Sequence, residues 1–349
     1  MSDPTTWAKG EGRASPVYHG GDLAQARARH PSAPTPWIDL STGINPHAWP
    51  IPPLAADVWR RLPEPRAVAA LERTAAAAFG VADAGCVAAV PGTQAAIQMV
   101  PRLLPGGRVG ILGFTYQEHA HVWRAAGRTV EIVDRLEDLA GFDVGLVVNP
   151  NNPDGRVIEP ARLAILAEEM AARGHRLVVD EAFVDVLSDA ASLASRLPLP
   201  GVVVLRSFGK TWGLAGVRLG FVLAEAATTA ALRAAFGPWA VSGPALEIGA
   251  AALADRAWLE AMRERLGEDA RRLDALLASA GLSILGGTPL FRLAAGEGAA
   301  GLADRLGAHG IHLRRFPHDP RLLRFGLPES EPEWQRLTDA LGVGPTSAG

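Results

Sequence analysis

Short, fully apolar runs alternate with helical patterns through the middle of this chain, and this alternation limits the fold more than any other feature. Six runs are predicted as buried strands, at 109–114, 130–133, 144–148, 177–179, 202–205 and 219–223. Helical patterns lie between several of them, at 93–104, 117–126 and 160–173. Strands that are apolar on both sides and joined by helices are typical of a mainly parallel sheet covered on both faces. We therefore predict an α/β fold with a mainly parallel sheet in a large domain.

The order of the later patterns predicts a second, smaller α/β domain. At a prior of about 150 residues per domain, 349 residues suggest two domains. After helical stretches at 225–236 and 244–280, the chain is expected to form a strand at 290–293, a helix at 301–310, strands at 312–315 and 322–325, and a helix at 332–341. The predicted division is an N-terminal arm with little structure of its own (1–40), a large domain (41–235), a small domain (236–343) and a tail (344–349).

Composition excludes several classes of protein. With 34 basic and 37 acidic residues, the net charge of −3 gives no electrostatic case for binding nucleic acid or an anionic membrane. The start of the chain has no apolar core typical of a signal peptide, and no apolar run is long enough for a transmembrane helix. The single cysteine, Cys86, excludes an internal disulfide and a zinc site built from several cysteines. We expect a cytoplasmic protein without a metal.

Lysine is almost absent, which makes one lysine informative. Only Lys9 and Lys210 occur, and Lys210 lies in the string SFGKTWGLAGVRLG directly after an apolar run. A lysine on a small, glycine-rich loop after a strand is suited to forming a Schiff base, because its amine can approach a cofactor ring. Ser207 and Arg218 flank it and could hold an anion beside it. A surface lysine on a turn is the alternative.

Two more polar strings follow predicted strands. The string NPNNPDG at 149–155 contains three of the four asparagines, although its residue types also suit a tight turn. Asp180 follows the run 177–179 in the string DEAF. A carboxylate at the end of a buried strand needs a partner, which a cationic cofactor group would supply. A helix N-cap is the alternative interpretation of Asp180.

Taken in order, the three strings resemble the fold type I pyridoxal-phosphate enzymes of the class I and II aminotransferase superfamily, over nearly the whole chain. The resemblance implies that Lys210 forms the Schiff base with pyridoxal 5'-phosphate, that Asp180 keeps the ring nitrogen protonated, and that Asn152 donates to the phenolic oxygen. It implies that Tyr116 stacks on the ring, with core packing as the alternative. The phosphate ligands that it implies are Ser207, Arg218 and the backbone of Gly92, Thr93 and Gln94 at a helix start.

The N-terminal strings are similar to one of two related subfamilies. HGGD at 19–22 and STGINP at 41–46 resemble the threonine-phosphate decarboxylases more than the histidinol-phosphate aminotransferases. In the decarboxylases this region lies over the active site and helps bind the substrate phosphate. The resemblance therefore implies substrate contacts from His19, Gly20 and Asn45. Phe183 agrees, since the aminotransferases usually carry tyrosine there.

The resemblance also assigns substrate-binding arginines and leaves two positions open. Arg314 and Arg324 match the pair that grips the substrate carboxylate, with Arg315 as the alternative to Arg314 if the register differs by one. Leu62 stands where the aminotransferases carry a tyrosine that reaches the partner subunit's cofactor. His119 follows the stacking motif where tyrosine is common, and its role is open.

The activity implied is decarboxylation of L-threonine O-3-phosphate to (R)-1-amino-2-propanol O-phosphate in cobalamin biosynthesis. Two alternatives stay open at this point. A histidinol-phosphate-type aminotransferase would use the same cofactor residues, and a pyridoxal-phosphate-binding regulatory protein would lack the reaction. Because the family builds its sites at a dimer interface, a homodimer is expected, with a small phosphorylated amino acid as substrate and no nucleic-acid or membrane partner.

Overall fold

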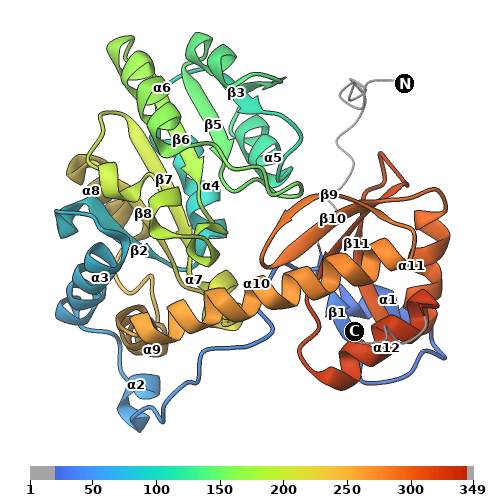
Figure 1. Ribbon diagram of the computed structural model, residues 1–349. Helices are drawn as coiled ribbons and strands as arrows, with labels where there is room; N and C mark the ends of the chain where they lie inside the picture. The colour runs from blue at the N-terminus through green and yellow to red at the C-terminus, as the bar shows by residue number, and fades with distance from the viewer. Residues whose placement is uncertain (1–19, 344–349) are drawn as a thin grey trace.

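Seven strands form the sheet of the larger domain in a computed structural model, which describes residues 20–343 (Figure 1). Their order across the sheet is β2-β8-β7-β6-β5-β3-β4. The strands are β2 (Val87–Val90), β3 (Arg108–Leu112), β4 (Thr129–Val133), β5 (Val144–Val148), β6 (Arg176–Asp180), β7 (Val202–Ser207) and β8 (Gly220–Ala224). Strands β3 to β7 are parallel, whereas β8 is antiparallel to both of its neighbours. The mainly parallel sheet predicted from the sequence is confirmed.

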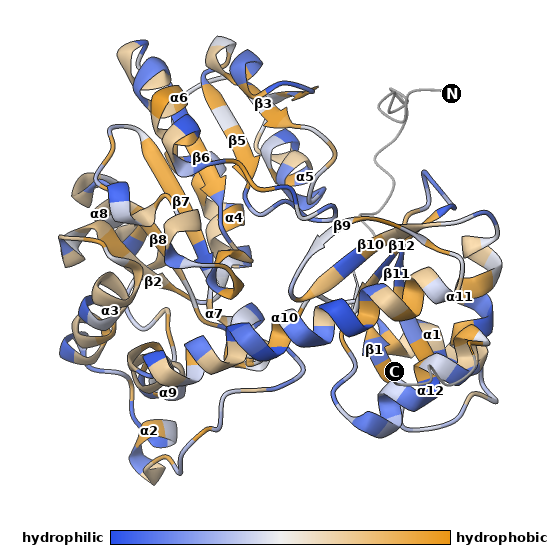
Figure 2. Cartoon of the chain, in the orientation of Figure 1, coloured by the Kyte–Doolittle hydropathy of each residue, from blue (hydrophilic) through white to orange (hydrophobic). Residues whose placement is uncertain are grey.

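Helices cover both faces of this sheet because its central strands are apolar on both sides. Every residue of β5 and β7 is buried, and β7 is hydrophobic until its last two residues, Arg206 and Ser207 (Figure 2). One core cluster joins the sheet to α3 (Pro65–Phe79), α6 (Pro160–Ala172) and α9 (Gly243–Ala254). A second core cluster joins the other face to α4 (Thr93–Leu103), α5 (Glu118–Ala125) and α8 (Ala226–Phe236).

The smaller domain is a five-stranded sheet with its own core. The strand order is β1-β11-β12-β10-β9, formed by β1 (Ile38–Leu40), β9 (Ser283–Thr288), β10 (Phe291–Ala295), β11 (Ile311–Arg315) and β12 (Leu322–Gly326). Helices α11 (Ala299–Ala308) and α12 (Glu331–Leu341) pack into the same cluster. The long helix α10 (Arg256–Ser279) runs between the two domains (Figure 1).

The structure differs from the sequence-based division at two places. Part of the predicted arm is ordered, because α1 (Leu23–Arg29) forms and β1 pairs in parallel with β11. The single helix predicted at 244–280 is two helices, with Asp255 capping the backbone N–H of Trp258 at the start of α10. Helix α9 packs against α3 in the larger domain, so that domain continues past residue 235.

Two short helices complete the larger domain, α2 (Ala56–Arg60) and α7 (Phe208–Thr211). Helix α2 stands at one corner of the molecule in Figure 1, while α7 continues β7 at the end of its strand. Across residues 20–343, no helix combines the length and the apolar character needed to cross a bilayer.

Candidate active site

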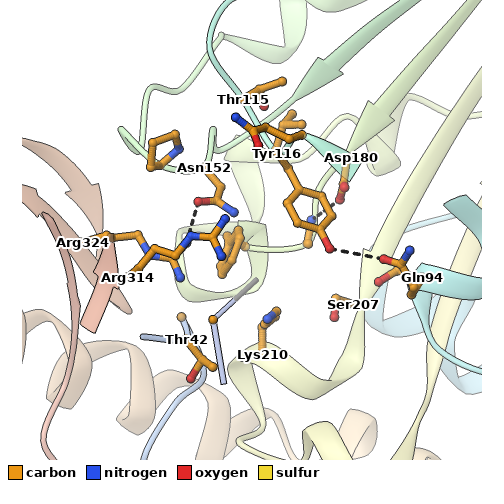
Figure 3. Close-up of a pocket in the computed structure, with 18 of the residues that line it drawn as sticks. Thr42, Gln94, Thr115, Tyr116, Asn152, Asp180, Ser207, Lys210, Arg314 and Arg324 are labelled. Carbon is orange, nitrogen blue, oxygen red and sulfur yellow. Dashed lines mark hydrogen bonds between the residues drawn. The ribbon is translucent and has the colours of Figure 1, made fainter. Parts of the chain in front are cut away.

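A cavity of about 290 Å³ lies at the carboxyl ends of the parallel strands, where the two domains meet (Figure 3). Parallel strands place their C-terminal residues at one edge of the sheet, which is where such folds bind ligands. The cavity brings together twelve of the predicted site residues: Gly20, Gly92, Thr93, Gln94, Tyr116, Asn152, Asp180, Ser207, Lys210, Arg218, Arg314 and Arg324.

Lys210 lies on the floor of the cavity, in the short helix α7. Burial, reinforced by the nearby positive charge of Arg324, lowers the pKa of its amine to about 8. The amine lies 5.6 Å from the ring centre of Phe183. A lowered pKa leaves a substantial neutral fraction near neutral pH, and the neutral amine is the nucleophile.

Asp180 ends β6 and is almost fully buried. Its Oδ1 accepts a hydrogen bond from the backbone N–H of Ala182, and its Oδ2 lies 2.8 Å from Nε2 of His119. His119 is equally buried, and it contacts Asp180, which itself lines the cavity. This contact fixes the orientation of the Asp180 carboxylate. The sequence left the role of His119 open, and the structure shows that it contacts Asp180.

An anion cradle lies at the start of α4. A Cβ on Gly92 would stand 2.7 Å from a guanidinium nitrogen of Arg218, and Gly92 has φ of 85°, so glycine suits this position against the arginine. Arg218 itself has a left-handed backbone with φ of 56°, a conformation that is rare for residues other than glycine. The first N–H groups of a helix have no partner within the helix, and its dipole favours negative charge. The arrangement is therefore suited to a phosphate.

Tyr116 stands beside this cradle and is held by its hydroxyl. The hydroxyl donates to Oε1 of Gln94 at 3.3 Å, and Nε2 of Gln94 donates to Oε1 of Glu118 at 3.0 Å. Burial, together with the negative charge of Glu118, raises the pKa of Tyr116 to about 12. The phenol therefore stays protonated at neutral pH and keeps donating to Gln94.

Arg324 joins the small domain to Asn152. Its Nη1 donates to Oδ1 of Asn152 at 2.5 Å (Figure 3). Its Nη2 donates to the carbonyl of Ser41 at 2.7 Å. Because arginine only donates, the amide oxygen of Asn152 must face Arg324 and its NH2 group is turned away from it. Within the described residues, Nε of Arg324 has no hydrogen-bond partner although it is buried. Burial and the neighbouring charge of Arg314 lower the pKa of Arg324 to about 9.

The structure favours Arg314 over Arg315 as the second arginine. Arg314 and Arg324 are paired residues on neighbouring antiparallel strands, so both reach the same wall of the cavity. Arg315 also touches the cavity, and its guanidinium binds Asp304 at 2.6 Å, but it has Leu323 and not Arg324 as its partner on β12.

Among the described residues, one predicted substrate contact does not line the cavity. Asn45 is buried outside the lining residues, where Nδ2 donates to the carbonyl of Thr211 at 2.7 Å and Oδ1 accepts from the N–H of His47 at 2.8 Å. Its backbone N–H also donates to the carbonyl of Lys210 at 2.9 Å. Asn45 therefore holds the segment that carries Lys210 and does not line the cavity that contains the other predicted residues. His19 lies outside the described residues.

Sequence reasoning missed several residues that shape the site. Thr42 and Phe114 line the cavity, as does His318, whose ring packs edge-on against Phe114 at 4.7 Å. Of these residues, only Thr42 lies in a string singled out from the sequence, STGINP at 41–46. The described chain contains no group of three or more His, Cys, Asp or Glu residues suited to a metal.

Comparison with known proteins places this geometry in context. The family described as aminotransferase class I and II matches residues 35–341. The threonine-phosphate decarboxylase of Pseudomonas aeruginosa is 44% identical over 328 residues, covering 93% of this chain and 97% of that protein. The threonine-phosphate decarboxylase of a Sinorhizobium species is 43% identical and covers 94% and 98%. The solved structure of histidinol-phosphate aminotransferase from Sinorhizobium meliloti with pyridoxal-5'-phosphate has a TM-score of 0.80 at 22% identity, covering 95% and 97%.

Proposed function

The chain belongs to the class I and II aminotransferase family, and we propose that it is a pyridoxal-phosphate-dependent threonine-phosphate decarboxylase. The observation that carries the proposal is the 44% identity to such a decarboxylase over almost the full length of both chains. The likeness to an aminotransferase structure at 22% identity concerns the fold. The activity proposed is release of CO2 from L-threonine O-3-phosphate, which leaves 1-amino-2-propanol O-phosphate, and its place in cobalamin biosynthesis stays a prediction.

The residues present fit pyridoxal phosphate. The cradle formed by Gly92, Arg218 and the start of α4 suits its phosphate, and a Cβ on Gly92 would close that approach. Asp180 supplies a buried carboxylate for a cationic ring nitrogen, and Lys210 supplies the amine. When bound, pyridoxal phosphate supplies a conjugated cationic ring that takes up the electron pair released as the carboxylate leaves.

The protein's own groups set up this chemistry. Asp180, directed by His119, holds negative charge where the ring nitrogen requires a proton. Asn152, turned by Arg324, presents NH donors to the cavity. With a pKa of about 8, the amine of Lys210 can lose and regain a proton near neutral pH, and we assign it the return of a proton to Cα.

Substrate binding falls to the small domain. Arg324 has a buried Nε that lacks a partner among the described residues, and Arg314 stands beside it on the neighbouring strand. Two adjacent guanidinium groups suit a carboxylate, which they can bind with several charge-assisted hydrogen bonds. A second anion, the substrate phosphate, would enter near Gly20 and Thr42, which line the same cavity.

Incubation with L-threonine O-3-phosphate tests the proposal. We expect stoichiometric CO2 release without any keto acid, and no amino transfer to 2-oxoglutarate. The Asp180→Asn variant is the control for background decarboxylation by free cofactor. Amino transfer from histidinol phosphate without CO2 release would instead establish the aminotransferase, and cofactor binding without either reaction would favour the regulatory protein.

We also propose that the enzyme is a cytoplasmic homodimer that pairs through the face around α2. Trp59, Leu62 and Trp239 are large apolar residues with 68%, 64% and 56% of their surface exposed. Trp59 and Leu62 flank the end of α2, which contacts α9, and Trp239 precedes α9. Large exposed apolar residues on neighbouring elements are typical of an interface. Sedimentation of wild type and Trp59→Glu tests this: a dimer that survives unchanged in the variant would contradict this face.

A further inference from the structure

Ser41 is a fully buried polar residue that lies just after β1, at the wall of the cavity. Its hydroxyl donates to Oδ1 of Asp39 at 2.6 Å and accepts the backbone N–H of Gly21 at 2.7 Å. Its own N–H also donates to Oδ1 of Asp39, at 2.9 Å. Both sides of the hydroxyl are therefore used, and one side holds the chain that enters the domain from the N-terminus.

Gly20 and Gly21 are fitted closely to Ser41. A Cβ on Gly20 would stand 2.4 Å from the carbonyl oxygen of Ser41, which no side chain tolerates. Gly21 has φ of 88°, a conformation that suits glycine. Gly20 lines the cavity. The glycine pair thus lets the chain lie directly against Ser41 at the edge of the pocket.

The carbonyl of Ser41 serves a third contact, since it accepts Nη2 of Arg324 at 2.7 Å. The other terminal nitrogen of this arginine binds Asn152. One residue therefore joins three parts of the site: Gly20 and Gly21, the strand β1 that carries Asp39, and the buried arginine assigned to the substrate carboxylate. The negative charge of Asp39 also favours the charged form of Arg324 and opposes the lowering of its pKa.

We propose that Ser41 is a positioning residue for substrate binding, which fixes Gly20 and Gly21 at the pocket wall while it holds Arg324 in the orientation that receives a carboxylate. This inference rests on the proposed function, because it treats Arg324 and the wall at Gly20 as the two ends of a site for a substrate with two anionic groups. Ser41 itself does not act on the reacting atoms. It acts through the groups that it binds: its hydroxyl holds Gly21, and its backbone carbonyl holds Arg324.

The test compares Ser41→Ala with Ser279→Ala, a matched change of an exposed serine on α10 that donates only to a backbone carbonyl one turn earlier. Hydrogen–deuterium exchange of a peptide over residues 17–29, which begins far enough before Gly21 to retain its amide label, reports the hydrogen bond of Gly21. Titration of the cofactor absorbance with L-threonine O-3-phosphate gives Kd, and steady-state turnover gives KM and kcat. For Ser41→Ala we expect faster exchange in that peptide, Kd and KM raised about tenfold or more, and kcat changed less than threefold. Ser279→Ala is expected to match wild type.

A double-mutant cycle with Asp39→Ala tests the connection between the two side chains. Because Asp39 acts on Gly21 through the Ser41 hydroxyl, the double variant should bind substrate no more weakly than the weaker of the two single variants. Gly20→Ala provides an independent approach if Ser41→Ala folds poorly. It leaves the hydroxyl in place, yet its Cβ would displace the chain, so the same rise in KM is expected.

Separate outcomes overturn the two proposals. If Ser41→Ala loses thermal stability but keeps wild-type KM, Kd and exchange, Ser41 is only a packing residue and the inference is wrong. Additive effects of Asp39→Ala and Ser41→Ala would also overturn it. If wild type shows no CO2 release, the proposed function fails. The exchange and the spectral Kd still decide the role of Ser41, because neither depends on which reaction follows.

Discussion

Replacing Lys210 by methionine is expected to stabilise the protein when no cofactor is bound. The ordinary pKa of a lysine is 10.5, and burial at the cavity floor lowers that of Lys210 to about 8. Since each pKa unit corresponds to about 1.4 kcal/mol, holding the charged amine in the folded state costs up to about 3 kcal/mol at neutral pH. Any solvent that reaches the cavity lowers this cost, so the value is an upper bound. Methionine has a similar length without the charge, so most of this cost should be recovered.

The two pKa values of Lys210, about 8 in the folded chain and 10.5 in the unfolded chain, determine how the free energy of unfolding changes with pH. Between pH 8 and 10.5 the unfolded chain binds the proton more strongly than the folded chain does, so wild-type stability rises with pH in that window. Below pH 8 the lysine is charged in both states and the full cost remains. The advantage of Lys210→Met should therefore be constant below pH 8 and fall by about 1.4 kcal/mol per pH unit above it.

Urea unfolding of cofactor-free protein at pH 7 and pH 9 measures the effect. Arg265→Met is the control, because it removes one positive charge from an exposed position on α10. We expect the variant at position 210 to exceed wild type by up to about 3 kcal/mol at pH 7 and by about 2 kcal/mol at most at pH 9. A variant no more stable than wild type at pH 7, or an advantage that grows with pH, would refute the reasoning.

Three further predictions concern neighbouring groups. Asp180→Asn should retain cofactor, seen as its absorbance, yet lose on the order of 10²-fold in kcat, because an amide cannot hold the ring proton by charge; near-normal turnover would remove Asp180 from the mechanism. His119→Phe should lower kcat about tenfold or more with cofactor still bound, since Asp180 loses its side-chain partner, and His119→Gln should recover part of it in the same assay. Gly155→Ala should lower the free energy of unfolding by about 1–3 kcal/mol more than Gly174→Ala in urea titrations. Both glycines have positive φ, but only at 155 would a Cβ meet backbone, 2.0 Å from the carbonyl oxygen of Gly287, so equal losses would contradict this.

The cofactor side of the cavity was predictable because its residues are few in kind and lie at strand ends. Asp180 ends a buried strand, Lys210 and Asn152 follow buried strands, and parallel strands bring their C-terminal ends to one edge. The scarcity of lysine and asparagine in this chain made those positions stand out from the background. Local pattern and sheet geometry together were sufficient to group them.

Contacts between distant segments were not predictable by the same reasoning. His119 and Asp180 are 61 positions apart and meet only because β6 and α5 pack in the same fold. Asn45 belongs to the string that indicated a substrate site, yet its amide donates to the carbonyl of Thr211 and accepts from the backbone N–H of His47. Residue type alone does not distinguish an amide that faces a ligand from one that completes a turn. The strand β1 was missed because its pairing with β11 is made across almost the whole sequence.

The substrate side of the cavity depends on how closely the two domains approach. A Cβ on Gly286 would stand 2.2 Å from the carbonyl oxygen of Asp154, so the hairpin of the small domain lies directly against the loop that carries Asn152. Arg324, which also belongs to the small domain, donates to the amide oxygen of Asn152 and so sets the orientation of that amide. The orientation of a predicted cofactor ligand in the large domain is thus set by a predicted substrate ligand in the small one. A movement of one domain relative to the other would shift Arg324 and turn the amide of Asn152 at the same time. Substrate binding at Arg324 is therefore coupled to the hydrogen bond that Asn152 offers.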